Sequence, residues 1–540
     1  MSKMKSLSFT LPAAALLAAT PAMADITADE LWAIWQQQAA DFGYTISAQA
    51  TPSGNGLVLS NVTNTMMIEE VAVSGSIEQV TLTNRDDGTV AISVGDRMMY
   101  RISGFEGSDA PDSVDIMLSL AGFSGTASGS AQNLQIVSGF ERIAVESVEF
   151  VGGDPSEMPD MIHDVSLTGY SATASYDLSD PANLGFTATG SLDALTFNVE
   201  MFEPAGNGGG APMPQPIPQQ PTYPAPGKVV MPQLLPEPAP MPQPTGGRGE
   251  GHLELVIGMT GLQSTSTGTM PRGIDWMTIE TMPAGFSISG DASYSSANAS
   301  FDFVDGRDMI DFSASNTGGS VGFGMSMDNL RYALAATGVE LSLASNEMPF
   351  PVAASAESTG LSIDVPLAQS ATPSPFSASI AYRGVSVDEG LWAMVDPGQA
   401  IPRTPATVVL DLSGTMQLFV DLMTMDPTAL SAPPGELRDL TLNELRISFG
   451  GAELTGTGDV DFTPGQMIPM PVGAVELSLT GANGLIQSLS QGGLLPPDQA
   501  GMARGMLGMF AIPGATADSY TSTIEFLPGG GITANGMPLQ

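Results

Sequence analysis

EPAGNGGGAPMPQPIPQQPTYPAPGKVVMPQLLPEPAPMPQPTGG, from Glu203 to Gly247, divides this chain of 540 residues into two parts. Fourteen of the 42 prolines lie between Pro204 and Pro244. Proline fixes φ and has no backbone N–H, so such a segment neither continues a helix nor joins the interior of a sheet. Its composition predicts an extended spacer or a disordered linker or insertion over residues 203–250.

On both sides of this segment, single large apolar residues alternate with Ser, Thr, Gly or Ala. In the N-terminal part, residues 25–202, Tyr170 to Tyr176 shows this period of two. In the C-terminal part, residues 251–540, it recurs from Tyr332 to Leu334 and from Val339 to Leu343. The pattern predicts strands with one buried and one solvated face. We expect a mainly β fold of elongated antiparallel sheets that could form a groove, with three or four short helices.

A helix is expected at the start of the N-terminal part. Thr27 to Glu30 matches a capping box, which predicts a helix over residues 28–40 that ends at Gly43. Trp32 and Trp35 would supply the apolar stripe that packs this helix on a sheet.

Further short helices are expected late in the chain. Asp388 is a helix N-cap residue, and the helix it opens, Glu389 to Val395, must stop before Pro397. Apolar residues at helical spacing predict two more helices, over residues 484–490 and 500–510.

The composition excludes several classes of function. The chain carries 57 acidic against 16 basic residues, a formal charge of −41, so no basic surface for nucleic acid can form. We interpret the acidity as a means of staying soluble. There is no cysteine and there are two histidines, which removes disulfides, zinc–thiolate sites and histidine-rich metal sites. We therefore expect no cofactor and assign no metal-binding residue.

Residues 1–24 predict a secretory signal peptide. Lys3 and Lys5 precede the apolar run Leu11 to Ala19, and Ala22 to Ala24 fits the small-x-small cleavage pattern. No later apolar run reaches the length of a membrane span, so we expect no integral membrane segment after cleavage. The predicted location is the periplasm.

One motif could indicate catalysis. Gly318 to Gly322 matches the nucleophile pattern G-x-S-x-G around Ser320, but that pattern needs a helix after it, and here strand-like alternation follows. A triad would also need His163 or His252. The acidic stretch Asp302 to Asp308 fits a hairpin tip better than a calcium loop. We expect no enzyme and assign no catalytic or cofactor-binding residue.

Three stretches resemble known families. Gly390 to Pro397 (GLWAMVDP), followed by Ile401 to Arg403 and Thr407 to Ser413, resembles a family of uncharacterised secreted alphaproteobacterial proteins catalogued as a domain of unknown function. Leu31 to Gln36 is similar to the same family, so the resemblance would cover most of the mature chain. It implies a periplasmic location but no activity. The end of the chain, Gly531 to Leu539, is similar to the last strand of AsmA-like envelope proteins. That likeness implies a long curved sheet with an apolar inner face that handles lipids.

These observations leave three hypotheses of function. The first is a non-catalytic periplasmic envelope protein that binds lipid or another apolar ligand in a β-groove. The alternative is a structural or scaffold protein of the cell envelope, with the proline-rich segment as a spacer. The third is a serine hydrolase around Ser320. An exposed apolar trough would favour the first hypothesis, and two closed, fully packed sandwiches would favour the second.

Overall fold

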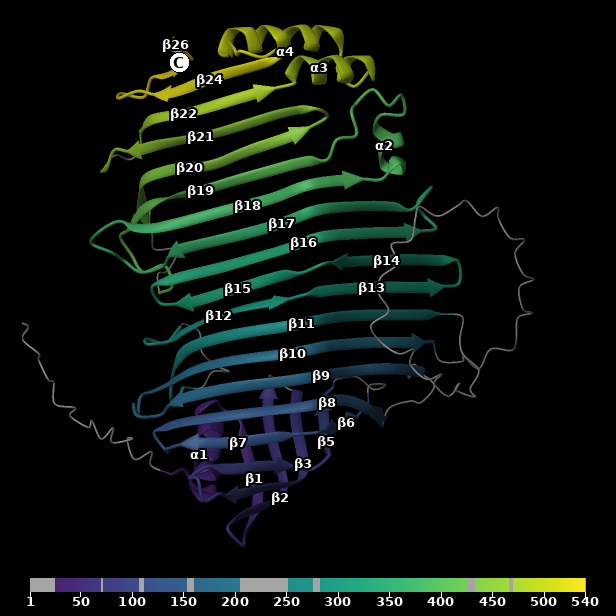
Figure 1. Cartoon of the computed structure of the whole chain (residues 1–540), viewed down its shortest axis with the longest axis vertical. Helices are drawn as coiled ribbons and strands as arrows, with labels where there is room; N and C mark the ends of the chain where they lie inside the picture. Colours follow the sequence, from purple (N-terminus) through teal and green to yellow (C-terminus); the bar gives the residue numbers. More distant parts are fainter. Residues whose placement is uncertain are drawn as a thin grey trace, which may run out of the picture.

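The chain forms one long antiparallel sheet in the computed structural model (Figure 1). The structure describes residues 25–68, 71–105, 111–152, 160–203, 251–274, 282–424, 433–465 and 470–539. The predicted signal peptide and residues 204–250 of the proline-rich segment lie outside the described residues. The expected mainly β fold with antiparallel strands and a few short helices is confirmed.

Ten strands precede the proline-rich segment. They are β1 (Thr45–Ser53), β2 (Gly56–Ile68), β3 (Val71–Asn84), β4 (Val90–Val94), β5 (Arg97–Ser103), β6 (Ser113–Ala121), β7 (Ser124–Gly129), β8 (Asn133–Val151), β9 (Asp160–Asp177) and β10 (Asn183–Phe202).

The other strands of the described residues follow that segment. They are β11 (His252–Pro271), β12 (Ser287–Tyr294), β13 (Ser296–Asp305), β14 (Asp308–Asn316), β15 (Gly319–Ser326), β16 (Asn329–Ser345), β17 (Val352–Pro366), β18 (Ser374–Val387), β19 (Ala406–Leu418), β20 (Gly435–Phe449), β21 (Ala452–Phe462), β22 (Pro471–Thr480), β23 (Ile512–Pro513), β24 (Ser519–Phe526), β25 (Ile532–Ala534) and β26 (Met537–Pro538).

The sheet is a meander in which the chain runs back and forth along one axis. Four strand positions are made of two short strands placed end to end: β4 with β5, β6 with β7, β12 with β13, and β14 with β15. Up to β22, each position pairs antiparallel with the position that precedes it and the one that follows it in sequence. Figure 1 shows the strands stacked like rungs, from β8 to β24.

The proline-rich segment interrupts a single hairpin. β10 and β11 pair along their whole length, and the last pair before the segment is Phe202 with His252. One residue further on, the Glu203 N–H donates to the Gly251 carbonyl at 3.0 Å. The two β-rich parts of the chain are therefore joined by one continuous sheet, and the segment leaves it between two neighbouring strands.

The N-terminal end of the sheet holds the best-packed core. Helix α1 (Ala28–Asp41) begins with the predicted capping box at Thr27 and is followed by Gly43 at φ 76°. Its Leu31 and Trp32 are buried against side chains of β2, β3, β4, β7 and β8, where the strands curl across one another (Figure 1). The core side chains that the strands supply are Leu57, Leu59, Val80, Leu82, Val90, Ile92, Ala127 and Leu134.

The remaining helices lie near the C-terminal end. α2 (Glu389–Val395) is N-capped by the Asp388 side chain as predicted, and α3 (Ala482–Gln491) and α4 (Pro497–Phe510) precede β23. They stand beside and above the last strands in Figure 1. None of the helices in the described part of the chain has the length and apolarity needed to cross a bilayer.

Candidate functional site

An uncharged row of side chains crosses the sheet at right angles to its strands. Residues paired directly across an antiparallel ladder point to the same face. Following these pairs from β8 to β24 connects fourteen residues, which we call the central row. They are Ser138, Ala172, Gly190, Ser264, Ala292, Val321, Leu334, Leu361, Ile380, Leu410, Leu445, Gly456, Leu477 and Ser522. At about 4.8 Å per strand, the row is about 60 Å long.

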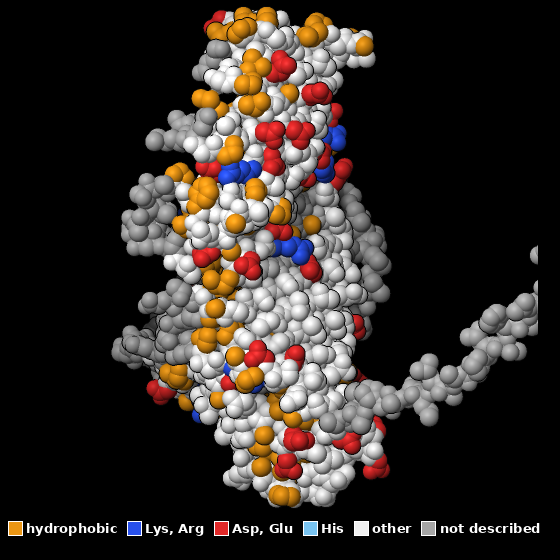
Figure 2. Space-filling model, turned by 90° about the vertical axis from the view of Figure 1, so that its left-hand side faces the viewer, with side chains coloured by type: hydrophobic (Ala, Val, Ile, Leu, Met, Phe, Trp, Pro, Cys, Tyr) orange, Lys and Arg blue, Asp and Glu red, His pale blue; other side chains and the backbone are white. Residues whose placement is uncertain are grey.

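The middle of this face is apolar and open to solvent. Val321, Leu334, Leu361, Ile380 and Leu410 of the central row are 36–44% exposed. Seven more exposed large side chains lie on the same face of β15 to β20: Phe323, Tyr332, Ile363, Tyr382, Val408, Ile447 and Phe449. We call these twelve residues the apolar patch. Figure 2 shows hydrophobic side chains gathered in a band along the long axis.

The charged residues of these strands lie on the other face. Arg331, next to Tyr332 in sequence, reaches Asp291 at 3.1 Å, and Arg383, next to Tyr382, reaches Glu444 at 2.9 Å. Hydrogen bonds from Arg383 lower the pKa of Glu444. Because successive side chains of a strand point to opposite faces, these ion pairs leave the central row free of charge.

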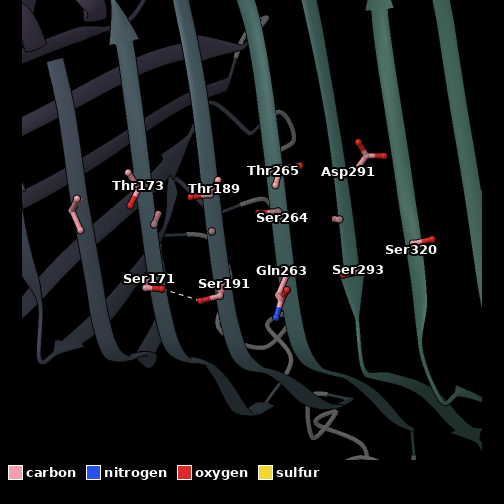
Figure 3. A pocket seen from close by; sticks show the side chains of 14 residues that line it. Ser171, Thr173, Thr189, Ser191, Gln263, Ser264, Thr265, Asp291, Ser293 and Ser320 are labelled. Carbon is pink, nitrogen blue, oxygen red and sulfur yellow. Dashed lines mark hydrogen bonds between the residues drawn. The ribbon is translucent and has the colours of Figure 1, made fainter. Parts of the chain in front are cut away.

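The polar face has a shallow hollow opposite the row (Figure 3). It has a volume of about 610 Å³ and is lined mostly by hydroxyl groups of β9 to β12 and β15, with the Ser171 and Ser191 hydroxyls 2.9 Å apart. Ser320 lies at its edge, inside β15 and paired with Ser293 and Ala335. The strand–turn–helix elbow that a nucleophilic serine needs is not formed here.

Neither histidine lies near Ser320. On β11, the residue in the same cross-strand row as Ser320 is Gln263. His252 lies eleven residues from Gln263 along this strand, a distance of roughly 35 Å in extended chain. His163 lies on β9, eight residues from Ser171 in that row. The structure thus does not bring together the residues of the hydrolase hypothesis. The stretch from Asp302 to Asp308 forms the predicted hairpin tip between β13 and β14. No cluster of metal-ligating side chains is found among the described residues.

Four glycines in the left-handed backbone conformation explain how long strands keep their apolar side chains on one face. They are Gly169, Gly261, Gly338 and Gly384, with φ between 57° and 65°. A Cβ at each would collide with a side chain from a neighbouring position of the sheet, namely Asp193, Ser295, Thr317 and Glu357. In β16 the apolar positions are even-numbered before Gly338 and odd-numbered after it. An irregular residue breaks the two-residue alternation, so both halves of a strand can point apolar side chains to one face.

The motif around α2 has a structural role at the edge of the apolar patch. Asp396 is 1% exposed, and its carboxylate accepts hydrogen bonds from the N–H groups of Ala400 and Ile401 at 3.0 and 2.8 Å and from Arg403 at 2.7 Å. These hydrogen bonds lower the pKa of the Asp396 carboxyl, and the one from the Ile401 N–H has the largest effect. The Arg403 guanidinium also lies 4.3 Å from the centre of the Trp392 ring, which stacks on Phe449. The motif therefore fixes α2 against the end of β20.

Comparison with known proteins gives a family match for part of the chain. Residues 298–531 match a family described as an uncharacterized protein conserved in bacteria, DUF2125. The match begins in β13, ends before β25 and includes all twelve residues of the apolar patch and the whole α2 motif. The expected resemblance to a family of unknown function is confirmed over these residues, whereas Leu31 to Gln36 lies outside them. No curated protein matches the chain.

The apolar patch could be foreseen only in part. One-sided alternation indicated strands with an apolar face, but which residues meet across strands depends on the hairpin registers, which the alternation does not contain. The patch includes residues from segments as distant as Val321 and Phe449.

Proposed function

We propose that this protein binds lipid or another apolar ligand on the apolar face of its sheet, without catalysis, in the periplasm. The observation that supports this most is the apolar patch, where twelve large side chains on neighbouring strands are exposed on one face. Exposed apolar areas beyond a few hundred Å² mark interaction sites in soluble proteins, and at about 25 cal/mol per Å² covering such an area is strongly favourable.

The distribution of charged side chains favours a ligand that is bound through its apolar chains. With 16 basic residues in the whole chain, and Arg331 and Arg383 engaged in ion pairs on the opposite face, an anionic headgroup would find few cations beside the row. The ligand would then be recognised through the exposed side chains of the apolar patch, which extends across six neighbouring strands, or about 25 Å. The proposed location rests on the signal peptide predicted over residues 1–24.

Native mass spectrometry of protein purified from the periplasm of the bacterium that makes it tests this proposal. Leu334→Asp, Leu361→Asp and Ile380→Asp together place three charges on the patch. Ala335→Asp, Ser362→Asp and Ala381→Asp are the matched control, because these neighbours point to the polar face. We expect retained lipid in the wild type and the control, and its loss from the patch variant.

Two outcomes contradict the proposal. One is a wild-type protein that carries no lipid from its own periplasm, and the other is equal lipid retention in both triple variants. A defined protein assembly without lipid would support the scaffold hypothesis instead.

A further inference from the structure

A cavity of about 350 Å³ lies inside the curled N-terminal end of the sheet. Its walls come from α1, β1 to β5, β8 and the turn before β7, and include Trp35, Ile46, Val62, Met98, Phe123 and Ile136. None of the described residues that line it carries a charge. Its wall combines buried residues of the N-terminal core, Leu59, Val80 and Ile92, with partly buried apolar residues that pack against that core.

The few polar groups in the cavity wall do not indicate a polar ligand. The Asn64 side-chain oxygen already accepts a hydrogen bond from the Gly75 N–H at 2.8 Å. The other polar side-chain groups of the wall are the serine and tyrosine hydroxyls and the indole N–H of Trp35. An apolar cavity of about 150 Å³ takes up one benzene ring, so this one has room for about fourteen carbon atoms.

The cavity adjoins the face that carries the central row. Ser138, the first residue of the central row, lines the cavity, and so does Ile136, two residues before it on the same side of β8. Ile136 pairs with Ala174, and Ala174 pairs with Ala188, so small side chains on the same face continue from the cavity wall across β9 and β10. An extended chain seated in the cavity could therefore continue along the row.

We propose that this cavity is a binding site for one alkyl chain, which enters end first and leaves the rest of the ligand on the central row. The proposal rests on the proposed function for its ligand class, and adds a discrete site at one end of the face. The shared chemistry is an unbranched chain of about fourteen carbons, supplied either by a free fatty acid or by an acyl chain of a phospholipid.

Tryptophan fluorescence provides a local readout, because Trp35 is part of the cavity wall. In a full-length Trp276→Phe, Trp392→Phe background, only Trp32 and Trp35 of α1 remain. The probes are myristic acid brominated at its chain end, and phosphatidylethanolamine vesicles whose acyl chains carry the same bromine. Saturable quenching by the fatty acid, the vesicles or both is expected, and the arm that quenches identifies the source of the chain.

Ser138→Phe fills the cavity from β8 and should weaken quenching at least tenfold. Val137→Phe is the matched control, since Val137 lines the hollow on the opposite face and this change should leave quenching unaltered. If Ser138→Phe fails to fold, Val62→Phe fills the cavity from β2.

Absence of quenching by both probes, or equal quenching in Ser138→Phe and Val137→Phe, would overturn the site. Lipid retention by native mass spectrometry separates this failure from that of the proposed function. A Ser138→Phe protein that keeps its lipid, beside a patch variant that loses it, leaves the binding face valid and removes the cavity.

Discussion

Replacing the proline-rich segment by a tight turn should stabilise the hairpin that it interrupts. Residues 204–250 close a loop of 47 residues between Glu203 and Gly251, whose backbones are hydrogen-bonded. Asn-Gly in their place would give the two-residue turn that suits antiparallel strands. If the segment behaves as the flexible chain that its composition predicts, closure entropy changes by about 0.6 kcal/mol for each halving of the loop. Between four and five halvings give about 2–3 kcal/mol.

Native-state hydrogen exchange followed by mass spectrometry measures this locally. The opening free energy of the amides at the ends of β10 and β11 should rise by about 2–3 kcal/mol, while the amides of β1 to β3 should not change. A Gly/Ser segment of the same length is the control and should leave exchange unaltered. Faster exchange in the Asn-Gly protein would mean that the removed residues pack on the sheet, which refutes the reasoning.

The remaining predictions concern single side chains. Leu31→Ala empties a fully buried position of the N-terminal core and should lower the free energy of unfolding by about 3–5 kcal/mol. Leu361→Ala, at a position 44% exposed, should lower it by about 1–2 kcal/mol. Chemical denaturation measures both, and equal losses of stability would contradict the assignment of core and open face. Trp392→Ala removes a half-buried ring from Phe449 and Arg403 and should cost about 2 kcal/mol, measured in the same way; a variant that unfolds like the wild type would show that the stack contributes nothing. Asp396 has a folded pKa below its ordinary value of 3.8, so its contribution to stability is present above that value and is lost as the pH falls through the folded pKa. Thermal unfolding between about pH 2 and 6 should therefore be less acid-sensitive in Asp396→Asn than in the wild type, and parallel pH profiles would refute this linkage.

Local signals in the sequence were sufficient for the starts of α1 and α2, whereas α3 and α4 begin two and three residues before the predicted positions and have no side-chain cap. The capping box at Thr27 and the N-cap at Asp388 each satisfy a backbone N–H within three residues, so no distant part of the chain is needed to specify them. The Asp305-Gly306 turn between β13 and β14 is similarly local.

Strand lengths were harder to predict, for a physical reason. Tyr332 to Leu334 and Val339 to Leu343 were expected as separate strands, yet both lie in β16. The left-handed Gly338 between them shifts the alternation by one residue without ending the ladder, because the same register with β17 resumes beyond it. A search for a constant period of two therefore divides each such strand into two.

The cavity was not predicted either. Its walls combine α1 with strands as distant in sequence as β8, and it exists because the N-terminal strands curl across one another. Curvature of this kind depends on the twist of the whole sheet, which a periodic pattern does not contain.

Strands that follow one another in sequence lie side by side in the sheet, so the length of the sheet can change by one hairpin at a time. Because each central strand, in the part of the chain that the structure describes, pairs with the strands beside it, duplicating or deleting one hairpin in the middle should leave both ends intact. Each step would alter the span by about 10 Å, two strand widths. The span of the sheet can therefore change in units of one hairpin while the fold of both ends is kept.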